Sequence, residues 1–146
     1  PPQHLVTQAV WWTLPEDLLT GQARLDARAI PGSLHAAEHA AIGMLPLLAL
    51  CDRWDIGGLS TPMHRDTGQP TVFIYDGYQG GAGLAERSHR RLGEHLVMTR
   101  QAVAGCRCAS GCPSCVQSPK CGNGNEPLDK DGAVRVLDVL LGLAPI

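Results

Sequence analysis

The pattern of β-branched and aromatic residues predicts three strands. Residues 71–75 (Thr-Val-Phe-Ile-Tyr) form the clearest one, directly after the turn-forming residues 67–70. Residues 9–14 form a second, with two tryptophans that we expect to be buried on both faces, and residues 55–61 form a turn that enters a short third strand. Two strands joined by so short a connection are most simply antiparallel.

The strongest helical signal is the alanine-rich segment 34–51. Pro31 and Gly32 predict a turn before it, and Ser33 is a suitable N-cap. Pro46 lacks a backbone donor, so we expect a kink there or two abutting segments. The preceding residues 18–29 are polar and only weakly helical.

A second helix is predicted over residues 84–103, because polar and apolar side chains at spacings of three and four form one stripe. That stripe consists of Leu84, Ser88, Leu92, Leu96, Thr99 and Val103. A last helix is expected after an Asp129 or Asp131 cap, ending at Gly142 and Pro145. The pattern therefore predicts an α+β fold, a small mainly antiparallel sheet packed with about three helices and a cysteine loop before the last helix.

Length and net charge limit the number of domains and the kinds of partner that the chain can have. The 146 residues suit one domain with a real core. Twelve Lys and Arg against 14 Asp and Glu give a net charge of −2, so any nucleic-acid contact must come from a local patch. The candidate basic residues for such a patch are Arg107, Lys120, Arg87, Arg90 and Arg91.

No apolar run is long enough for a membrane span, and no secretory signal opens the chain. We therefore expect a reducing, cytoplasmic location and no membrane partner. The chain begins Pro-Pro without Met, which suggests a piece of a longer protein.

Five of the six cysteines lie within residues 106–121, at CxC and CxxC spacings and among glycines and prolines. Such short turns let thiolates converge on one tetrahedral Zn²⁺. The loop has very few bulky apolar side chains, so a metal must supply the order that packing cannot. We predict a structural zinc ion.

Two ligand sets are compatible with this spacing. The more compact set is Cys106, Cys108, Cys112 and Cys115, and the rival set exchanges Cys106 for Cys121. Disulfides are disfavoured because the cluster is odd and the expected compartment is reducing. The isolated Cys51 is most simply a small core residue.

His35-Ala-Ala-Glu38-His39 matches H-x-x-E-H, in which two histidines bind Zn²⁺ and the glutamate activates water. A small zinc hydrolase is therefore an alternative function. The simpler interpretation is a polar patch whose imidazoles bond to nearby backbone or to Asp52 and Asp55.

The glycine-rich segment 76–83 connects a strand to a helix. Glycines there serve a tight turn and close packing, and the helix N-terminus is alternatively a phosphate contact. There is no Gly-Lys-Ser/Thr sequence, no acidic ATPase motif and no GxSxG elbow. This chain alone therefore has no recognisable catalytic machinery for nucleotide hydrolysis.

These motifs together resemble one family. The matching segments are His35–Ala40, Asp55–Gly58, Tyr75–Tyr78, Gly80–Glu86, Cys106–Cys115 and the tail Gln117–Lys130. The chain is similar to the C-terminal metal-binding domain (DUF1998 or MZB type) of superfamily-two DEAD/DEAH-type DNA helicases of the mitomycin repair factor A kind, related to the Hrq1-type helicases.

The resemblance implies that residues 1–146 are a single zinc-binding accessory domain from the C-terminal part of an ATP-dependent 3′-to-5′ DNA repair helicase. It maps the family's four metal ligands onto Cys106, Cys108, Cys112 and Cys115. ATP and Mg²⁺ would act only in the motor domains of the parent chain. Expected partners are those motor domains, single-stranded DNA and a repair nuclease. A module that only recruits a partner and never touches DNA is the remaining alternative.

Overall fold

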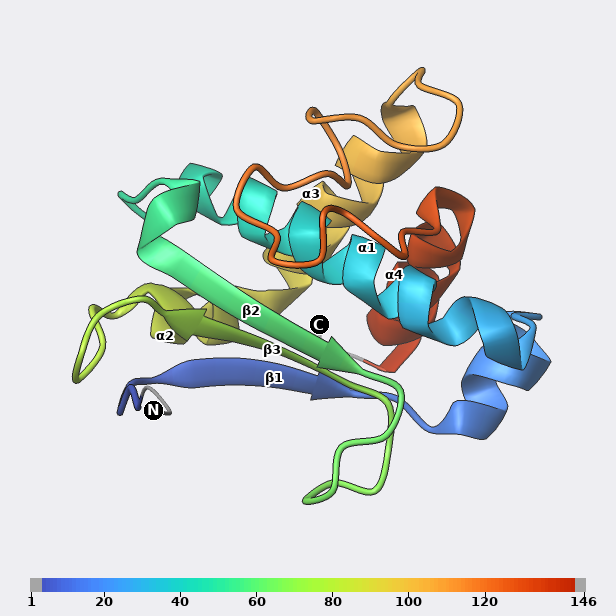
Figure 1. The fold of residues 1–146 in the computed structure, drawn as a ribbon, viewed down its shortest axis with the longest axis horizontal. Helices are drawn as coiled ribbons and strands as arrows, with labels where there is room; N and C mark the ends of the chain where they lie inside the picture. Colours follow the sequence, from blue (N-terminus) through green and yellow to red (C-terminus); the bar gives the residue numbers. More distant parts are fainter. Residues whose placement is uncertain (1–3, 144–146) are drawn as a thin grey trace.

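The computed structural model describes residues 4–143 and contains a three-stranded antiparallel sheet (Figure 1). Its strands are β1 (Ala9–Thr13), β2 (Ile56–Thr61) and β3 (Thr71–Asp76), in the order β1-β3-β2. Both outer strands pair antiparallel with β3. The predicted α+β class, the three strands and their antiparallel pairing are confirmed.

The two faces of this sheet differ in their exposure. Val10 and Trp12 of β1 are buried, whereas Trp11 between them is 56% exposed and its ring lies 6.2 Å from that of Phe73. The expectation that both tryptophans are buried is therefore wrong for Trp11. Successive side chains of a strand point to opposite faces, and the helices cover only one of these faces.

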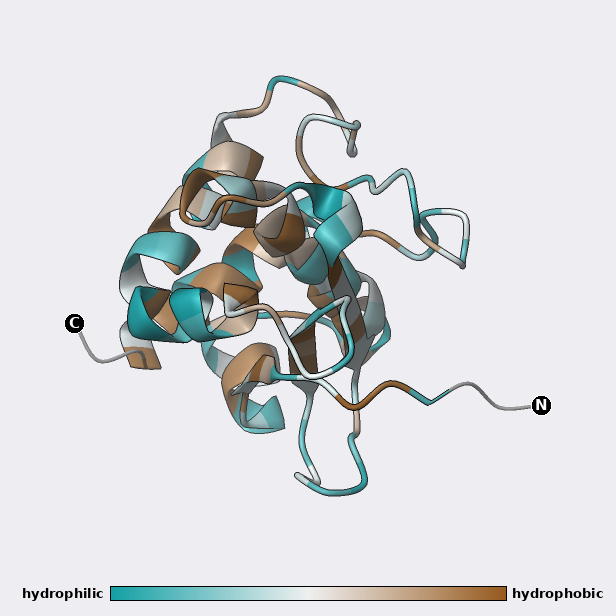
Figure 2. Cartoon of the chain, turned by 90° about the vertical axis from the view of Figure 1, so that its left-hand side faces the viewer, coloured by the Kyte–Doolittle hydropathy of each residue, from teal (hydrophilic) through white to brown (hydrophobic). Residues whose placement is uncertain are grey.

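Helix α1 (Ile30–Met44) lies across the covered face of the sheet and also contacts the later helices α3 and α4 (Figure 1). Twelve of its 15 residues are buried, so it is the centre of the core. Figure 2 shows hydrophobic segments where the helices meet and a hydrophilic connection between β2 and β3. This central position explains the alanine-rich sequence, because small side chains allow close approach on all sides.

The predicted boundaries of this helix are wrong. It begins at Ile30 and includes Pro31, which the first helical turn accepts because its N–H would have no partner there. The hydroxyl of Ser33 donates to the carbonyl of Ala29 instead of capping the helix. At the other end α1 gives way to a 3₁₀ turn at Leu45–Leu47, so the predicted break at Pro46 takes the form of two abutting segments.

The predicted helix over residues 84–103 is divided into α2 (Leu84–Arg90) and α3 (Leu92–Gly105). The break lies at Arg91, whose backbone angles of φ −121° and ψ 39° are not helical. The predicted stripe still faces the core, since all its members are buried except the half-buried Leu92. Because of this division the described residues hold four α-helices, rather than about three.

Helix α4 (Lys130–Leu143) is the last described element. Asp129 precedes it and its carboxylate accepts a hydrogen bond of 2.8 Å from the backbone N–H of Gly132, as an N-cap does. Of the two predicted caps, Asp129 is therefore the one used. Gly142 lies inside the helix, and Pro145 lies outside the described residues.

The remaining helical segments are short. A π-helical turn (Leu18–Gln22) and a 3₁₀ turn (Ala27–Ala29) precede α1, in agreement with the weak helical signal there. A further 3₁₀ turn (Arg53–Asp55) leads into β2. In residues 4–143 no helix is both long and apolar enough to cross a membrane.

His95 is a fully buried polar residue that connects three helices. Its Nε2 lies 2.7 Å from the carbonyl oxygen of Ala41, which can only accept, so Nε2 carries the proton. Its Nδ1 then accepts from the hydroxyl of Ser88, also at 2.7 Å. Burial lowers the pKa of His95, although the bond to Ala41 acts in the opposite direction.

A pH dependence of stability follows from His95. The unfolded chain binds a proton near pH 6.5, the ordinary pKa of histidine, that the folded chain takes up only at lower pH. The contribution of His95 to the free energy of unfolding is therefore complete above about pH 6.5 and is lost as the pH falls below it. We expect His95→Gln, which keeps a donor for Ala41, to lose less stability between neutral and acidic pH in urea titrations. Equal losses in both proteins would contradict this.

Candidate metal centre

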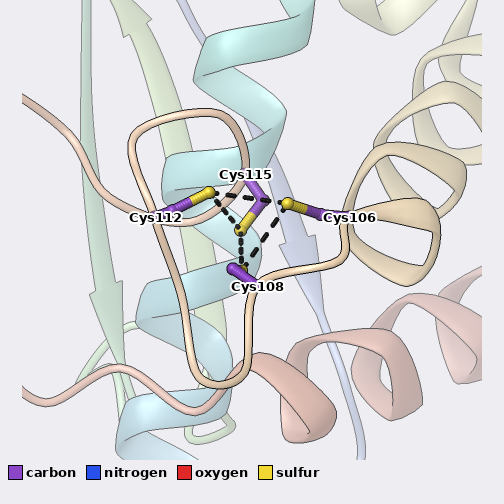
Figure 3. Close-up of side chains that lie close together, drawn as sticks. All are labelled: Cys106, Cys108, Cys112 and Cys115. Carbon is purple, nitrogen blue, oxygen red and sulfur yellow. Dashed lines mark hydrogen bonds between the residues drawn. The ribbon is translucent and has the colours of Figure 1, made fainter.

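Four cysteine side chains converge in the loop between α3 and α4 (Figure 3). The Sγ atom of Cys106 lies 3.6 Å from that of Cys108 and 3.5 Å from that of Cys112. The Sγ atom of Cys115 lies 3.5 Å from that of Cys108 and 3.8 Å from that of Cys112. Zn–S bonds of about 2.3 Å in a tetrahedron place sulfurs about 3.8 Å apart. The cluster is thus close to the size that one zinc ion requires.

The same distances do not fit disulfides, whose sulfurs are about 2.05 Å apart. All six cysteines are free thiols. Four thiolates this close repel one another strongly without a cation between them. The donor set and its spacing therefore fit a structural Zn²⁺.

The local backbone explains why these sulfurs meet. Helix α3 ends at Gly105, and Cys106 turns the chain into an extended conformation. Gly111 has a φ of +135°, which side-chain-bearing residues rarely adopt, and this bend returns the chain toward Cys106. The N–H of Cys115 then bonds to the carbonyl of Cys112 at 3.0 Å, which closes the CxxC turn.

Lys130, the first residue of α4, holds the loop from outside. Its ammonium donates to the carbonyls of Cys106 and Cys108 at 2.7 and 2.6 Å and lies 3.2 Å from the Cys108 sulfur. Desolvation opposes ionisation of Cys108, but hydrogen bonds from Lys130 and the neighbouring thiols lower the pKa of this thiol to about 6. A ZnS₄ centre carries excess negative charge, which this cation offsets. No local sequence pattern indicated this role of Lys130.

Cys121 lies apart from this cluster. Its Sγ is 3.5 Å from Nε2 of His35, and it forms a second group of potential metal donors with His35 and His39. The geometry therefore assembles Cys106, Cys108, Cys112 and Cys115, and it does not assemble the rival set with Cys121. Cys51 is half-buried against the core, as expected for a packing residue.

The H-x-x-E-H histidines bond to backbone, as the simpler interpretation predicted. Nδ1 of His35 lies 2.8 Å from the carbonyl of Pro127, and Nδ1 of His39 lies 2.8 Å from that of Val116. Asp52 and Asp55 are not their partners, because these two residues cap their own 3₁₀ turn. Between the histidines, burial raises the pKa of Glu38 to about 7, against a hydrogen bond from Ser60. What sequence reasoning missed is Cys121 as the third donor, although it was the one clustered cysteine outside the compact set.

The glycine-rich segment 76–83 serves a tight turn. The buried carboxylate of Asp76 accepts hydrogen bonds from the N–H groups of Ala82, Leu84 and Ala85. These are the donors that a phosphate would need, and a negative charge already occupies them. The alternative of a phosphate contact at this helix N-terminus is therefore wrong.

Most of the candidate basic residues are engaged within the fold. Lys120 donates to the carbonyls of Arg53 and Ile56, and Arg87 donates to that of Leu48. Arg90 and Arg91 pair with neighbouring glutamates. Arg107, between two of the clustered cysteines, is exposed and has no ion pair within residues 4–143.

The fold and the cluster together define a small α+β domain organised around a Cys₄ zinc-type centre. Residues 37–116 match the family of the MrfA Zn-binding domain (MZB), and the chain belongs to this family. The zinc-binding domain type expected from the sequence is thereby confirmed.

Relatives of known sequence and structure agree with this assignment. The chain is 40% identical over 113 residues to the uncharacterized protein MJ1572.1 of Methanocaldococcus jannaschii, covering 74% of this chain and 99% of that protein. It is 34% identical to the ATP-dependent helicase YprA of Bacillus subtilis, covering 80% of this chain and 15% of YprA. A crystal structure of the DUF1998 helicase MrfA bound to DNA superposes with a TM-score of 0.73 at 29% identity, covering 96% of this chain and 18% of that one.

Proposed function

We propose that this chain is the zinc-stabilised accessory domain of an ATP-dependent 3′-to-5′ DNA helicase that acts in DNA repair in the cytoplasm. In this proposal the four clustered cysteines hold one structural Zn²⁺. The domain shapes the neighbouring motor domains, which bind ATP and Mg²⁺, and helps to guide single-stranded DNA. A repair nuclease as a further partner stays a prediction from the sequence.

The observation that carries the proposal is the convergence of four sulfurs at zinc-like spacing, in a fold that matches 96% of this chain to part of a DNA-bound helicase. A metal centre of four thiolates has no open position for substrate, so it supports structure rather than catalysis. The relationship to YprA and MrfA supports a motor outside these residues, since the chain spans less than a fifth of each.

The proposed contact with single-stranded DNA can be tested by substituting Arg107. The zinc-loaded chain is expected to bind single-stranded DNA weakly, with an affinity that falls as salt rises because phosphate contacts release counterions. Arg107→Ala should weaken binding and reduce the salt slope by about one contact, whereas Arg90→Ala, which removes a paired arginine, should not. Fluorescence anisotropy over a salt series measures this. Absence of binding at low salt, or equal effects of both variants, would favour a module that only recruits proteins.

A further inference from the structure

A second cluster of metal donors includes the two histidines of the H-x-x-E-H segment of α1 and borders the same cavity as residues of β2. His35 and His39 are one turn apart on this helix, with ring centroids separated by 4.1 Å, and both are almost entirely buried. Cys121 approaches from the loop before α4, and the donor atoms of all three residues lie within 4.8 Å of one another. The cluster is separate from the Cys₄ centre and shares no residue with it.

The spacing of these donors suits a transition metal. With Zn–N near 2.05 Å and Zn–S near 2.3 Å, tetrahedral geometry places an imidazole nitrogen and a thiolate about 3.6 Å apart. The observed distance from His35 Nε2 to Cys121 Sγ is 3.5 Å. This separation is therefore the one that a shared metal ion would impose.

The tautomers of both histidines are also set for metal binding. A backbone carbonyl can only accept a hydrogen bond, so the Nδ1 atoms that contact Pro127 and Val116 carry the protons. In each ring the lone pair available to a metal is then on Nε2. An imidazole that donates its other N–H to a carbonyl is the usual arrangement of a metal ligand, because that bond fixes the ring and raises its basicity.

The carbonyls of Val116 and Pro127 both belong to the loop between α3 and α4, which contains the Cys₄ cluster. Val116 directly follows Cys115, and Pro127 lies shortly before Asp129, which caps α4. The Cys₄ centre would thus order the backbone that orients the two histidines. The same two hydrogen bonds also tie the loop to α1, so any coupling between the two sites is reciprocal.

One coordination position would remain open. His35, His39 and Cys121 line a cavity of about 540 Å³, together with the buried Glu38 and with Ser60 of β2. Glu38 sits between the two histidines on the same helix. Three protein ligands beside a cavity are the arrangement of a site that keeps water or a small anion in its fourth position.

We propose that His35, His39 and Cys121 bind a second Zn²⁺ ion, distinct from the Cys₄ centre, whose fourth ligand comes from the adjoining cavity. Two imidazoles and one thiolate select Zn²⁺ or Co²⁺ over Mg²⁺ or Ca²⁺, which prefer oxygen ligands. This goes beyond the accessory-domain function, which requires only the first ion.

The proposal is tested by zinc content and by anomalous diffraction at the zinc edge. The wild-type chain, saturated with zinc and freed of excess by gel filtration, should hold two equivalents. Cys121→Ser should hold one, while Cys51→Ser, which changes the cysteine outside both clusters, should hold two. Crystals of the wild type should show two anomalous peaks, one of them beside the two imidazoles.

A wild-type chain that saturates at one equivalent, or a map with a peak at the Cys₄ centre alone, would overturn the proposal. Two equivalents in Cys121→Ser would overturn the assignment of this ligand. The diffraction result needs no variant, so it decides the question even if a substitution impairs folding. A peak at the imidazoles without one at the quartet would instead refute the structural zinc of the proposed function.

Discussion

The double variant Cys112→Ser, Cys115→Ser is expected to lose the zinc of the Cys₄ centre and the order of the loop between α3 and α4. Serine hydroxyls do not replace thiolates as Zn²⁺ ligands, and two remaining sulfurs cannot close the tetrahedron. In the cysteine-rich part of the loop, residues 106–121, the buried residues are Cys115 and Val116, so packing cannot substitute for the ion. Binding of a structural zinc contributes about 10 kcal/mol or more of apparent free energy, which exceeds the net stability of many domains.

Circular dichroism and thermal unfolding, with and without a strong chelator, measure this effect. The double variant and the chelated wild type should both lose the cooperative transition or unfold at a much lower temperature. Cys51→Ser is the matched control, because it removes a half-buried thiol that lies outside both donor clusters. An undiminished transition in the chelated wild type would show that packing alone holds the loop.

The strands were predictable because their signals are local. Residues 71–75 combine β-branched and aromatic side chains between turn residues, and the structure extends this strand by Asp76 alone. The β-branched and aromatic residues of β1 are an equally local signal. Which face of the sheet the helices cover, however, depends on contacts between residues that are distant in sequence. Burial of Trp12 and exposure of Trp11 could therefore not be read from the pair of tryptophans.

The predicted helix boundaries were wrong where two local rules compete. Pro31 and Gly32 are typical of turns, yet both fit the first turn of α1, where Gly32 approaches the backbone of Asp129. Arg91 has no residue-level signal for a break, and the stripe of buried positions continues across it. Tertiary packing decided both cases, as it commonly overrides intrinsic propensity.

The Cys₄ geometry followed from spacing, because four cysteines within ten residues have few ways to meet. The contacts of Lys130 and Cys121 could not be predicted from the spacing of residues in the sequence. Cys121 reaches His35 across 86 positions of the sequence, and Lys130 reaches Cys108 across 22. Such pairs depend on how α1 and α4 pack, which no local pattern specifies.

Asp76→Ala is expected to destabilise the fold strongly, although it lies outside the cysteine cluster. The carboxylate of Asp76 is fully buried and accepts from Ala82 at 2.6 Å, from Leu84 at 3.2 Å and from Ala85 at 2.7 Å. Alanine would leave these three N–H groups without their acceptor at the start of α2. Because each such group costs about 1–3 kcal/mol, we expect a loss of about 3–5 kcal/mol in the free energy of unfolding.

Urea denaturation of the zinc-loaded protein measures this loss, and two further variants make it specific. Asp76→Asn retains one acceptor oxygen and should lose less than Asp76→Ala. Asp66→Ala removes an exposed aspartate and should change stability by no more than about 0.5 kcal/mol. If Asp76→Ala behaves like Asp66→Ala, the three N–H groups find other partners and the carboxylate is not what fixes the start of α2. An intact zinc content in Asp76→Ala would separate its effect from that of the metal, because Asp76 contacts neither donor cluster.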